Sequence, residues 1–205
     1  MQYKKPADPD KVIEIRLSEI KYYLTRNKHI KDRYDYQLIK RIPGLIIDGD
    51  LWQYKVEAQK VFESSEKCIS VKEHFVDNKP WEETGLFKKV YKKKLKKLKE
   101  IKGCRNLKDL AALYRRYYDN LFHSIRQNGI ISPEEDGSVA PIYVDIENEG
   151  HYCYTYGGNH RLAMAFILNI QKMPVKIRAR HKAWQRLRDE LYTIGPTKFF
   201  SNIRI

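Results

Sequence analysis

The residues best suited to chemistry lie where a predicted strand runs into a predicted helix, between Tyr156 and Ala165. Gly157 and Gly158 stand at this junction, and glycine lets the backbone turn sharply and lets a ligand approach the main chain. The helix then opens with Asn159, His160 and Arg161. Unpaired amides at a helix start favour an anion, arginine can hold two phosphate oxygens, and histidine can donate a hydrogen bond or shuttle a proton. The segment predicts a phosphate site, with a purely structural turn as the alternative.

A second basic pair follows the next predicted strand. Arg180 and His181 precede Trp184, and they are candidates to complete a basic pocket, although a histidine beside a tryptophan is also typical of simple packing. Phosphoryl transfer further requires a metal such as Mg²⁺ and commonly a carboxylate base. The candidate acids show no spacing that singles out a pair; they are Glu134, Glu135, Asp136, Asp145 and Glu147. The metal ligands stay unassigned, and His123, His151 and Cys153 do not have the spacing of a zinc site.

The elements expected to position these residues alternate between strands and helices, which predicts an α+β fold. The clearest helix covers 107–128, where apolar and aromatic residues recur every three or four positions between a cap at Asn106 and a stop at Gly129. A short helix is expected after Ser18, carrying Ile20, Tyr23 and Leu24. The remaining predicted strands are 12–17, 141–146, 151–156 and 174–180, and the remaining predicted helices are 54–66, 160–168 and 182–191.

Residues 88–99 contain eight lysines in twelve positions. Val90, Tyr91, Leu95 and Leu98 still recur at helical spacing, so the run is typical of a solvated amphipathic helix whose apolar stripe packs on the body. A surface that grips a polyanion through charge alone is the second interpretation.

The order of the motifs in the second half resembles the ParB/sulfiredoxin superfamily. Its members share a helix ending near glycine, a Pro-Ile-x-Val strand, a glycine-basic box that opens a helix, and a Pro-Val strand. The matching segments here are Ser124–Ile130, Pro141–Val144, Gly157–Ala165 and Met173–Ile177. The resemblance covers about 117–180, and the stretch from Arg180 to Gln185 looks like an uncharacterised ParB-like subgroup.

This resemblance implies a small mixed sheet with helices in residues 106–205, and it leaves residues 1–105 as a largely helical extension of unknown role. It implies that Gly157, Gly158, Asn159, His160 and Arg161 bind nucleotide phosphates and that Arg126 and Gln127 contact the nucleotide. His160 and Arg161 would be the catalytic residues. Two departures narrow the activity. The box carries Asn159 where sulfiredoxins need cysteine, and only 25 residues follow Arg180, too few for the DNA-reading domain of partition proteins.

Composition is compatible with these expectations. The chain has 205 residues, 42% hydrophobic and 12% aromatic, enough to build a core, and 40 Lys and Arg against 26 Asp and Glu give a net charge of +14. No membrane span, signal peptide or disulfide framework is expected, so a cytoplasmic location is predicted. The leading hypothesis is an enzyme that uses ATP or another NTP with Mg²⁺ for phosphotransfer or hydrolysis on a small acceptor. The alternatives are a basic DNA- or RNA-binding module, with or without nuclease activity, and a nucleotide-binding protein without turnover.

Overall fold

A computed structural model describes residues 8, 10–24, 44–135, 137 and 139–197. Within them a mixed seven-stranded sheet runs in the order β1-β7-β5-β6-β2-β4, and β3 also pairs with β7. Neighbouring strands along this path alternate between antiparallel and parallel pairing. The strands are β1 (Val12–Arg16), β2 (Ile20–Leu24), β3 (Leu45–Ile47), β4 (Lys55–Glu57), β5 (Tyr143–Ile146), β6 (Tyr152–Tyr156) and β7 (Lys172–His181).

Both halves of the chain build this sheet. The central β5–β6–β7 group comes from the second half, whereas β1 and β3 pair with β7 and β2 pairs with β6. The boundary expected between residues 105 and 106 therefore does not separate the strands. The general α+β expectation is confirmed. The first half contributes helices as expected, and it also supplies four strands, β1 to β4, of the shared sheet.

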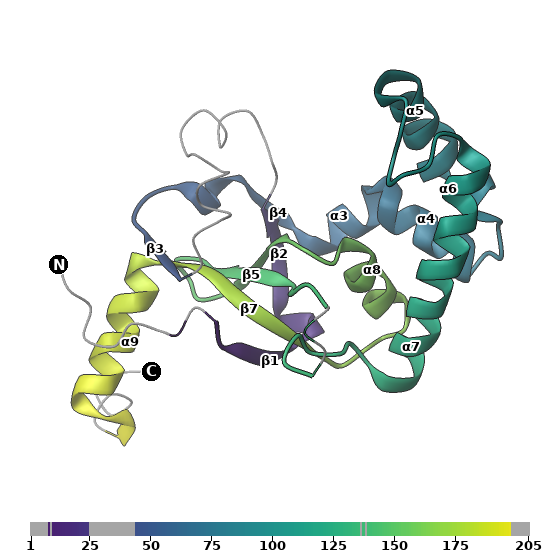
Figure 1. Cartoon of the computed structure of the whole chain (residues 1–205). Coiled ribbons are helices and arrows are strands. Elements are labelled where there is room, and N and C mark those ends of the chain that lie inside the picture. The colour runs from purple at the N-terminus through teal and green to yellow at the C-terminus, as the bar shows by residue number, and fades with distance from the viewer. Residues whose placement is uncertain (1–7, 9, 25–43, 136, 138, 198–205) are drawn as a thin grey trace.

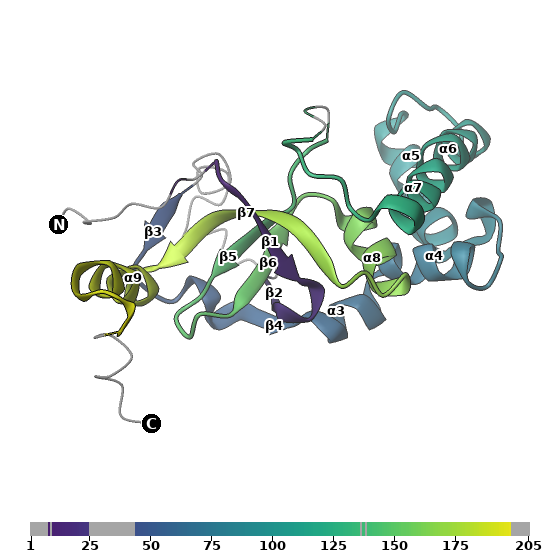
Figure 2. The ribbon, with the colours of Figure 1, turned by 90° about the horizontal axis from the view of Figure 1, so that it is seen from below.

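Most of the described helices gather at one end of the sheet, and α9 stands at the other end (Figures 1 and 2). They are α3 (Ala58–Ser64), α4 (Glu66–Phe75), α5 (Lys92–Leu98), α6 (Leu107–Tyr114), α7 (Asn120–Asn128), α8 (Asn159–Ile167) and α9 (Lys182–Ile194). Helix α8 packs against α4 and α7. A cluster of buried aromatic residues holds the helical end together, centred on Trp81, whose side chain is fully buried and whose Nε1 donates a hydrogen bond to Asp119.

Two π-helical segments interrupt these helices. Leu86–Tyr91 leads directly into α5, and Arg115–Asp119 joins α6 to α7. The helix predicted over 107–128 is thus one continuous rod with a π-helical middle, capped where expected by Asn106, whose side chain accepts a hydrogen bond from the amide of Asp109 at 2.9 Å. A π-helical turn shifts the side chains that follow it around the helix axis, and such turns are frequent at functional sites.

The strands and helices predicted in the second half agree with the structure to within a few residues. The helix expected after Ser18 is wrong, because a short 3₁₀ turn there leads into β2. The helix expected over 54–66 is shortened, because β4 occupies its first residues and α3 begins at Ala58. In the part of the chain that the structure describes, no helix is both long enough and apolar enough to cross a bilayer.

Candidate anion-binding site

The glycine turn links the end of β6 to the start of α8. Gly157 and Gly158 have φ angles of +85° and +60°, in the left-handed region that non-glycine residues avoid. A Cβ on Gly157 would lie 2.5 Å from the carbonyl oxygen of Pro141, so only glycine fits this close approach. The first hydrogen bond of α8 runs from the amide of Leu162 to the carbonyl of Gly158, which leaves the preceding amides without an acceptor inside the helix.

A cavity of about 450 Å³ opens beside this turn. Gly158 and the first three residues of α8 line one side, and the other side comes from Lys67, from Tyr91 and Lys102 around α5, from the Tyr117–Leu121 region and from the loop at Val139–Ala140. Its charged lining is cationic: no carboxylate is found among its described residues. A concave site with basic side chains and helix-start amides suits an anionic ligand.

His160 is the most perturbed group in this cavity. Its ring lies 4.2 Å from the ring of Tyr118, between centroids, and 5.7 Å from that of Tyr114. Burial, reinforced by the nearby charges of Lys67 and Lys102, lowers the pKa of His160 to about 3. Its Nε2 is buried and has no hydrogen-bond partner among the described residues. The imidazole is therefore neutral at neutral pH and carries one unused polar atom, which makes it a better hydrogen-bonding group than a proton shuttle.

Arg161 folds back over the turn. Its guanidinium donates a hydrogen bond to the carbonyl of Ala140, and its Nη2 and Nε lie 2.9 and 3.0 Å from the position that a Cβ on Gly158 would occupy. Burial lowers the pKa of Arg161, but an arginine keeps its charge through such a shift. Because guanidinium has five N–H donors, this loop contact leaves others for a ligand.

Asn159 lines the cavity as predicted for a phosphate-binding residue, but its side chain is held by hydrogen bonds within the fold. Gly158, and not Asn159, is the cap residue of α8, and the Oδ1 of Asn159 accepts a hydrogen bond from the hydroxyl of Tyr154 at 2.6 Å. The hydroxyl of Tyr23 lies 3.4 Å from the same oxygen. The side chain is thus fixed by tyrosines of β6 and β2, and Asn159 positions the start of α8.

Sequence reasoning missed two cations of the cavity, Lys67 and Lys102. Lys67 lies in α4, and Lys102 lies in the loop after α5, where its φ of +51° is unusual for lysine. The ammonium of Lys102 donates to the hydroxyl of Tyr118 at 2.9 Å and lies 5.2 Å from the ring centre. The strained backbone was the kind of signal that marks functional positions, but it is visible only in the structure.

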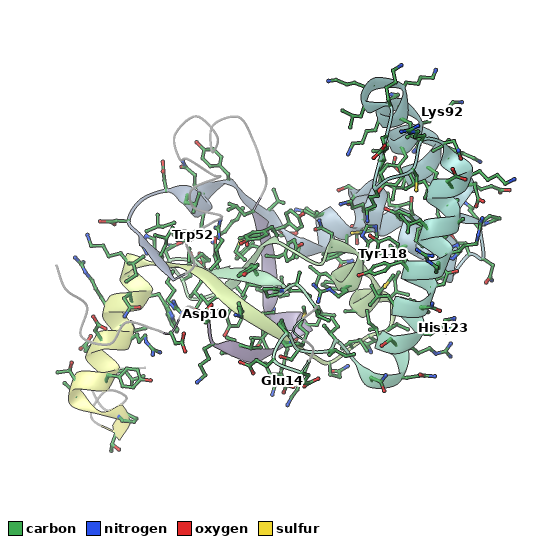
Figure 3. The ribbon with its side chains drawn as sticks, in the orientation of Figure 1. Asp10, Glu14, Trp52, Lys92, Tyr118 and His123 are labelled. Carbon is green, nitrogen blue, oxygen red and sulfur yellow. The ribbon has the colours of Figure 1, made fainter. Side chains whose placement is uncertain are left out.

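Tyrosines form the aromatic wall of the cavity, and the π-helical segments present them. Tyr91 ends the first segment, and Tyr117 and Tyr118 belong to the second. Figure 3 shows Tyr118 on the side of the helical end that faces α8. Tyr117 is 58% exposed, which is unusual for an aromatic side chain and leaves its ring available for stacking.

Three other residues predicted to bind a nucleotide do not line this cavity. Arg126 and Gln127 are exposed near the end of α7. His181 lies at the opposite end of the sheet, where its Nδ1 accepts a hydrogen bond from the amide of Ala183 and its ring meets that of Trp52 edge to face. His181 caps α9, and nearby Arg180 is buried in β7.

The candidate carboxylates also lie elsewhere. Asp145 is fully buried in β5 and accepts hydrogen bonds from Arg178 and Trp52. Glu134 and Glu135 are exposed in the loop before β5, outside the cavity lining. Asp136 lies outside the described residues. The described cavity residues consequently fit phosphate oxygens but offer Mg²⁺ no carboxylate ligand.

Glu147 belongs to a second charged cluster at the β5–β6 hairpin turn. Glu147, Glu149 and His151 bring their potential metal-ligating atoms within 4.8 Å of one another. The ammonium of Lys55 already contacts Glu147 at 2.5 Å and Glu149 at 4.0 Å. Burial favours the protonated form of Glu147, but the bonds from Lys55 and from the His151 amide outweigh it, and the pKa of Glu147 lies below its usual value. Lys55 balances the charge of the buried Glu147 carboxylate, which a metal ion would have to share with that ammonium.

No protein-family model matches this chain, and no curated protein or solved structure shows significant similarity to it. The resemblance to the ParB/sulfiredoxin superfamily therefore stays a prediction from the motifs.

Proposed function

We propose that this protein binds a nucleotide through its phosphates in the cavity at the glycine turn. The observation that carries the proposal is the lining: amides at the start of α8, the guanidinium of Arg161 and two lysine ammonium groups converge on a space without a described carboxylate. Each of these groups is a donor, and donors aimed at one point favour a multivalent anion.

The unpartnered Nε2 of His160 supports the same ligand. A buried polar atom without a partner costs about 1–3 kcal/mol, and a ligand oxygen or hydroxyl that reaches it would recover part of that cost. The tyrosine wall adds a surface for a nucleobase, and the cavity volume of about 450 Å³ lies within the range of small-molecule sites. ATP or another NTP meets these requirements better than inorganic phosphate, which would leave the aromatic wall unused.

Phosphotransfer or hydrolysis remains the predicted reaction of this site. Mg²⁺ would have to arrive with the nucleotide, held by its phosphates and water, because the described lining residues provide no carboxylate. His160, neutral and a weak base at a pKa of about 3, is suited to orient a phosphate or an acceptor hydroxyl. Arg161 would neutralise charge on the transferred group.

Thermal unfolding in the presence of ATP, CTP, GTP or UTP with Mg²⁺ tests the proposal. At a ligand concentration of 100 Kd, binding stabilises a folded protein by about 2.7 kcal/mol, which gives a rise in Tm of several degrees. Arg161→Ala and Lys102→Gln should each reduce this rise, and Arg126→Ala should keep it. An equal rise in the Arg161→Ala, Lys102→Gln and unmodified proteins would refute a phosphate site at this turn.

A further inference from the structure

The segment that contains the lysine-rich helix α5 begins and ends at the rim of the cavity. Tyr91, the residue immediately before α5, lines the cavity, and so does Lys102, four residues after the helix ends. The chain thus leaves the cavity, forms a short helix and returns to the same place. Figures 1 and 3 show α5 at the tip of the helical end, with Lys92 above the level of Tyr118.

This segment carries much of the net positive charge of the protein. Residues 86–105 contain nine lysines and one arginine against the single acid Glu100, a net +9 of the chain's +14. Of the apolar stripe expected to pack on the body, Tyr91 is buried and Val90 packs against the core. Helix α5 itself has no buried residue, and Leu98 at its end is 59% exposed. No described carboxylate forms an ion pair with six exposed lysines, which are Lys92, Lys93, Lys94, Lys96, Lys97 and Lys99. Packing against the hydrophobic core therefore does not account for helix α5.

We propose that the cavity and α5 together bind the end of a single nucleic-acid strand, with the terminal phosphate and its nucleotide in the cavity and the next phosphates along α5. The inference rests on the proposed function, because the cavity must first hold a nucleotide phosphate. It adds the class of ligand: an oligonucleotide with a terminal phosphate in place of a free nucleotide.

The dimensions favour this ligand. A cavity of about 450 Å³ accommodates one nucleotide and excludes a duplex end. Seven helical residues span about 10 Å, long enough for the lysines of α5 to contact two or more successive phosphates of one strand. Lysines hold phosphates as point charges without reading sequence, and the exposed ring of Tyr117 gives the first base a stacking partner.

The test measures the affinity of a labelled twelve-nucleotide single strand that carries a 5′-phosphate, a 3′-phosphate or no terminal phosphate, as a function of salt. The proteins are the full chain, Arg161→Ala, a variant with Lys93→Gln, Lys96→Gln and Lys97→Gln, and a charge-matched control. The control removes three exposed lysines far from α5, as Lys21→Gln, Lys60→Gln and Lys172→Gln.

We expect one of the two terminal phosphates to tighten binding about tenfold over the unphosphorylated strand, the gain expected of a good charge-assisted contact. Arg161→Ala should remove this gain and leave the residual binding. The α5 variant should weaken all three strands and lower the slope of log K against log salt by about 2, whereas the control should change that slope by less than 1.

Three results would overturn the proposal. The first is equal affinity for all three strands. The second is an equal effect of the α5 variant and its control on binding. The third is displacement of the labelled strand by inorganic polyphosphate of the same charge at the concentration at which unlabelled strand displaces it. If a mononucleotide still raises the Tm and the rise still depends on Arg161, the proposed nucleotide site is retained and only the strand-binding proposal is rejected. If the mononucleotide does not raise the Tm either, the nucleotide site and the strand-binding proposal are both rejected.

Discussion

The two ends of the β5–β6 strand pair place charged side chains in opposite situations. At the hairpin turn, Glu147 is buried beside the ammonium of Lys55, and the negative and positive groups satisfy each other. At the glycine turn, His160 is buried with a nitrogen that has no hydrogen-bond partner in the described part of the chain, and the charged residues described in the cavity lining are cationic. The buried carboxylate at the hairpin turn already has a cationic partner, whereas the buried imidazole at the glycine turn has a nitrogen without a partner among the described residues.

The difference shows that charged residues alone do not identify a site. Both ends contain a histidine, and the hairpin end even groups three potential metal ligands. What separates them is the partner of each group: Lys55 contacts both Glu147 and Glu149, so a cation would have to displace an ammonium already in place. Excess donors around a cavity are the more informative feature, because burial without a partner costs free energy that a ligand can return.

The buried ion pair next to the hairpin end gives the largest expected effect. Asp145→Asn removes the charge that the guanidinium of Arg178 meets inside the sheet, and an uncompensated buried charge costs about 3–5 kcal/mol. Urea unfolding should show this loss. Glu14→Gln, which breaks the exposed pair with Lys172 in the same sheet, should cost about 0.5 kcal/mol or less. Comparable losses in the two variants would contradict the structural role of the buried pair.

Gly157→Ala gives the next largest effect, at the opposite end of the strands. A left-handed alanine costs about 1–2 kcal/mol, and the approach to the Pro141 carbonyl adds strain, for about 2–4 kcal/mol in total. Gly103→Ala is the matched control, because its φ is also positive and nothing lies within 4 Å of its Cβ position. It should cost about 1 kcal/mol. If both substitutions cost the same, the tight contact at the turn does not constrain the backbone.

The glycine turn was predictable because its signals are local. A stretch of about a dozen residues contains the end of the strand at Tyr156, the two glycines and the apolar residues at helical spacing in α8. The secondary structure of this stretch follows from patterns within it. Local patterns failed at Ile20–Leu24, where apolar residues at helical spacing form β2 because that strand pairs with β6. Long-range pairing overrode the local periodicity there.

The rest of the site could not be predicted because its residues meet only in the folded chain. Lys67 in α4 and Lys102 in the loop after α5 precede Arg161 by many residues, and no local pattern predicts that either segment lies beside α8. The pairing of Lys55 with Glu147 likewise joins residues 92 positions apart and removes a candidate acid from consideration. Arg126 shows the reverse error, because the place in the motif order that the resemblance assigned to it did not bring it into the cavity.

The pH dependence of stability tests the buried state of His160. Its pKa of about 3 lies below the ordinary 6.5, so between these values the unfolded chain binds the extra proton. The contribution of His160 to the free energy of unfolding is therefore fully present above pH 6.5 and is lost as the pH falls toward 3. The loss amounts to about 2 kcal/mol at pH 5. His160→Phe should flatten the curve by that amount between pH 7 and 5. Parallel curves for the two proteins would show that His160 is protonated as easily when folded as when unfolded.

The smallest expected effect belongs to Arg126→Ala, and it compares two arginines directly. Arg126 is exposed on α7 outside the cavity, whereas Arg161 lies over the glycine turn. Arg126→Ala should therefore change nucleotide affinity by about twofold or less, the range of surface substitutions. Arg161→Ala, which reduces the rise in Tm, should weaken nucleotide binding by about tenfold or more. Isothermal titration with one Mg-nucleotide measures both. A residue that does not contact the ligand acts on it only through its charge, which physiological salt screens within about 8 Å. A tenfold loss of affinity for Arg126→Ala would therefore show that the bound nucleotide reaches beyond the cavity to the end of α7.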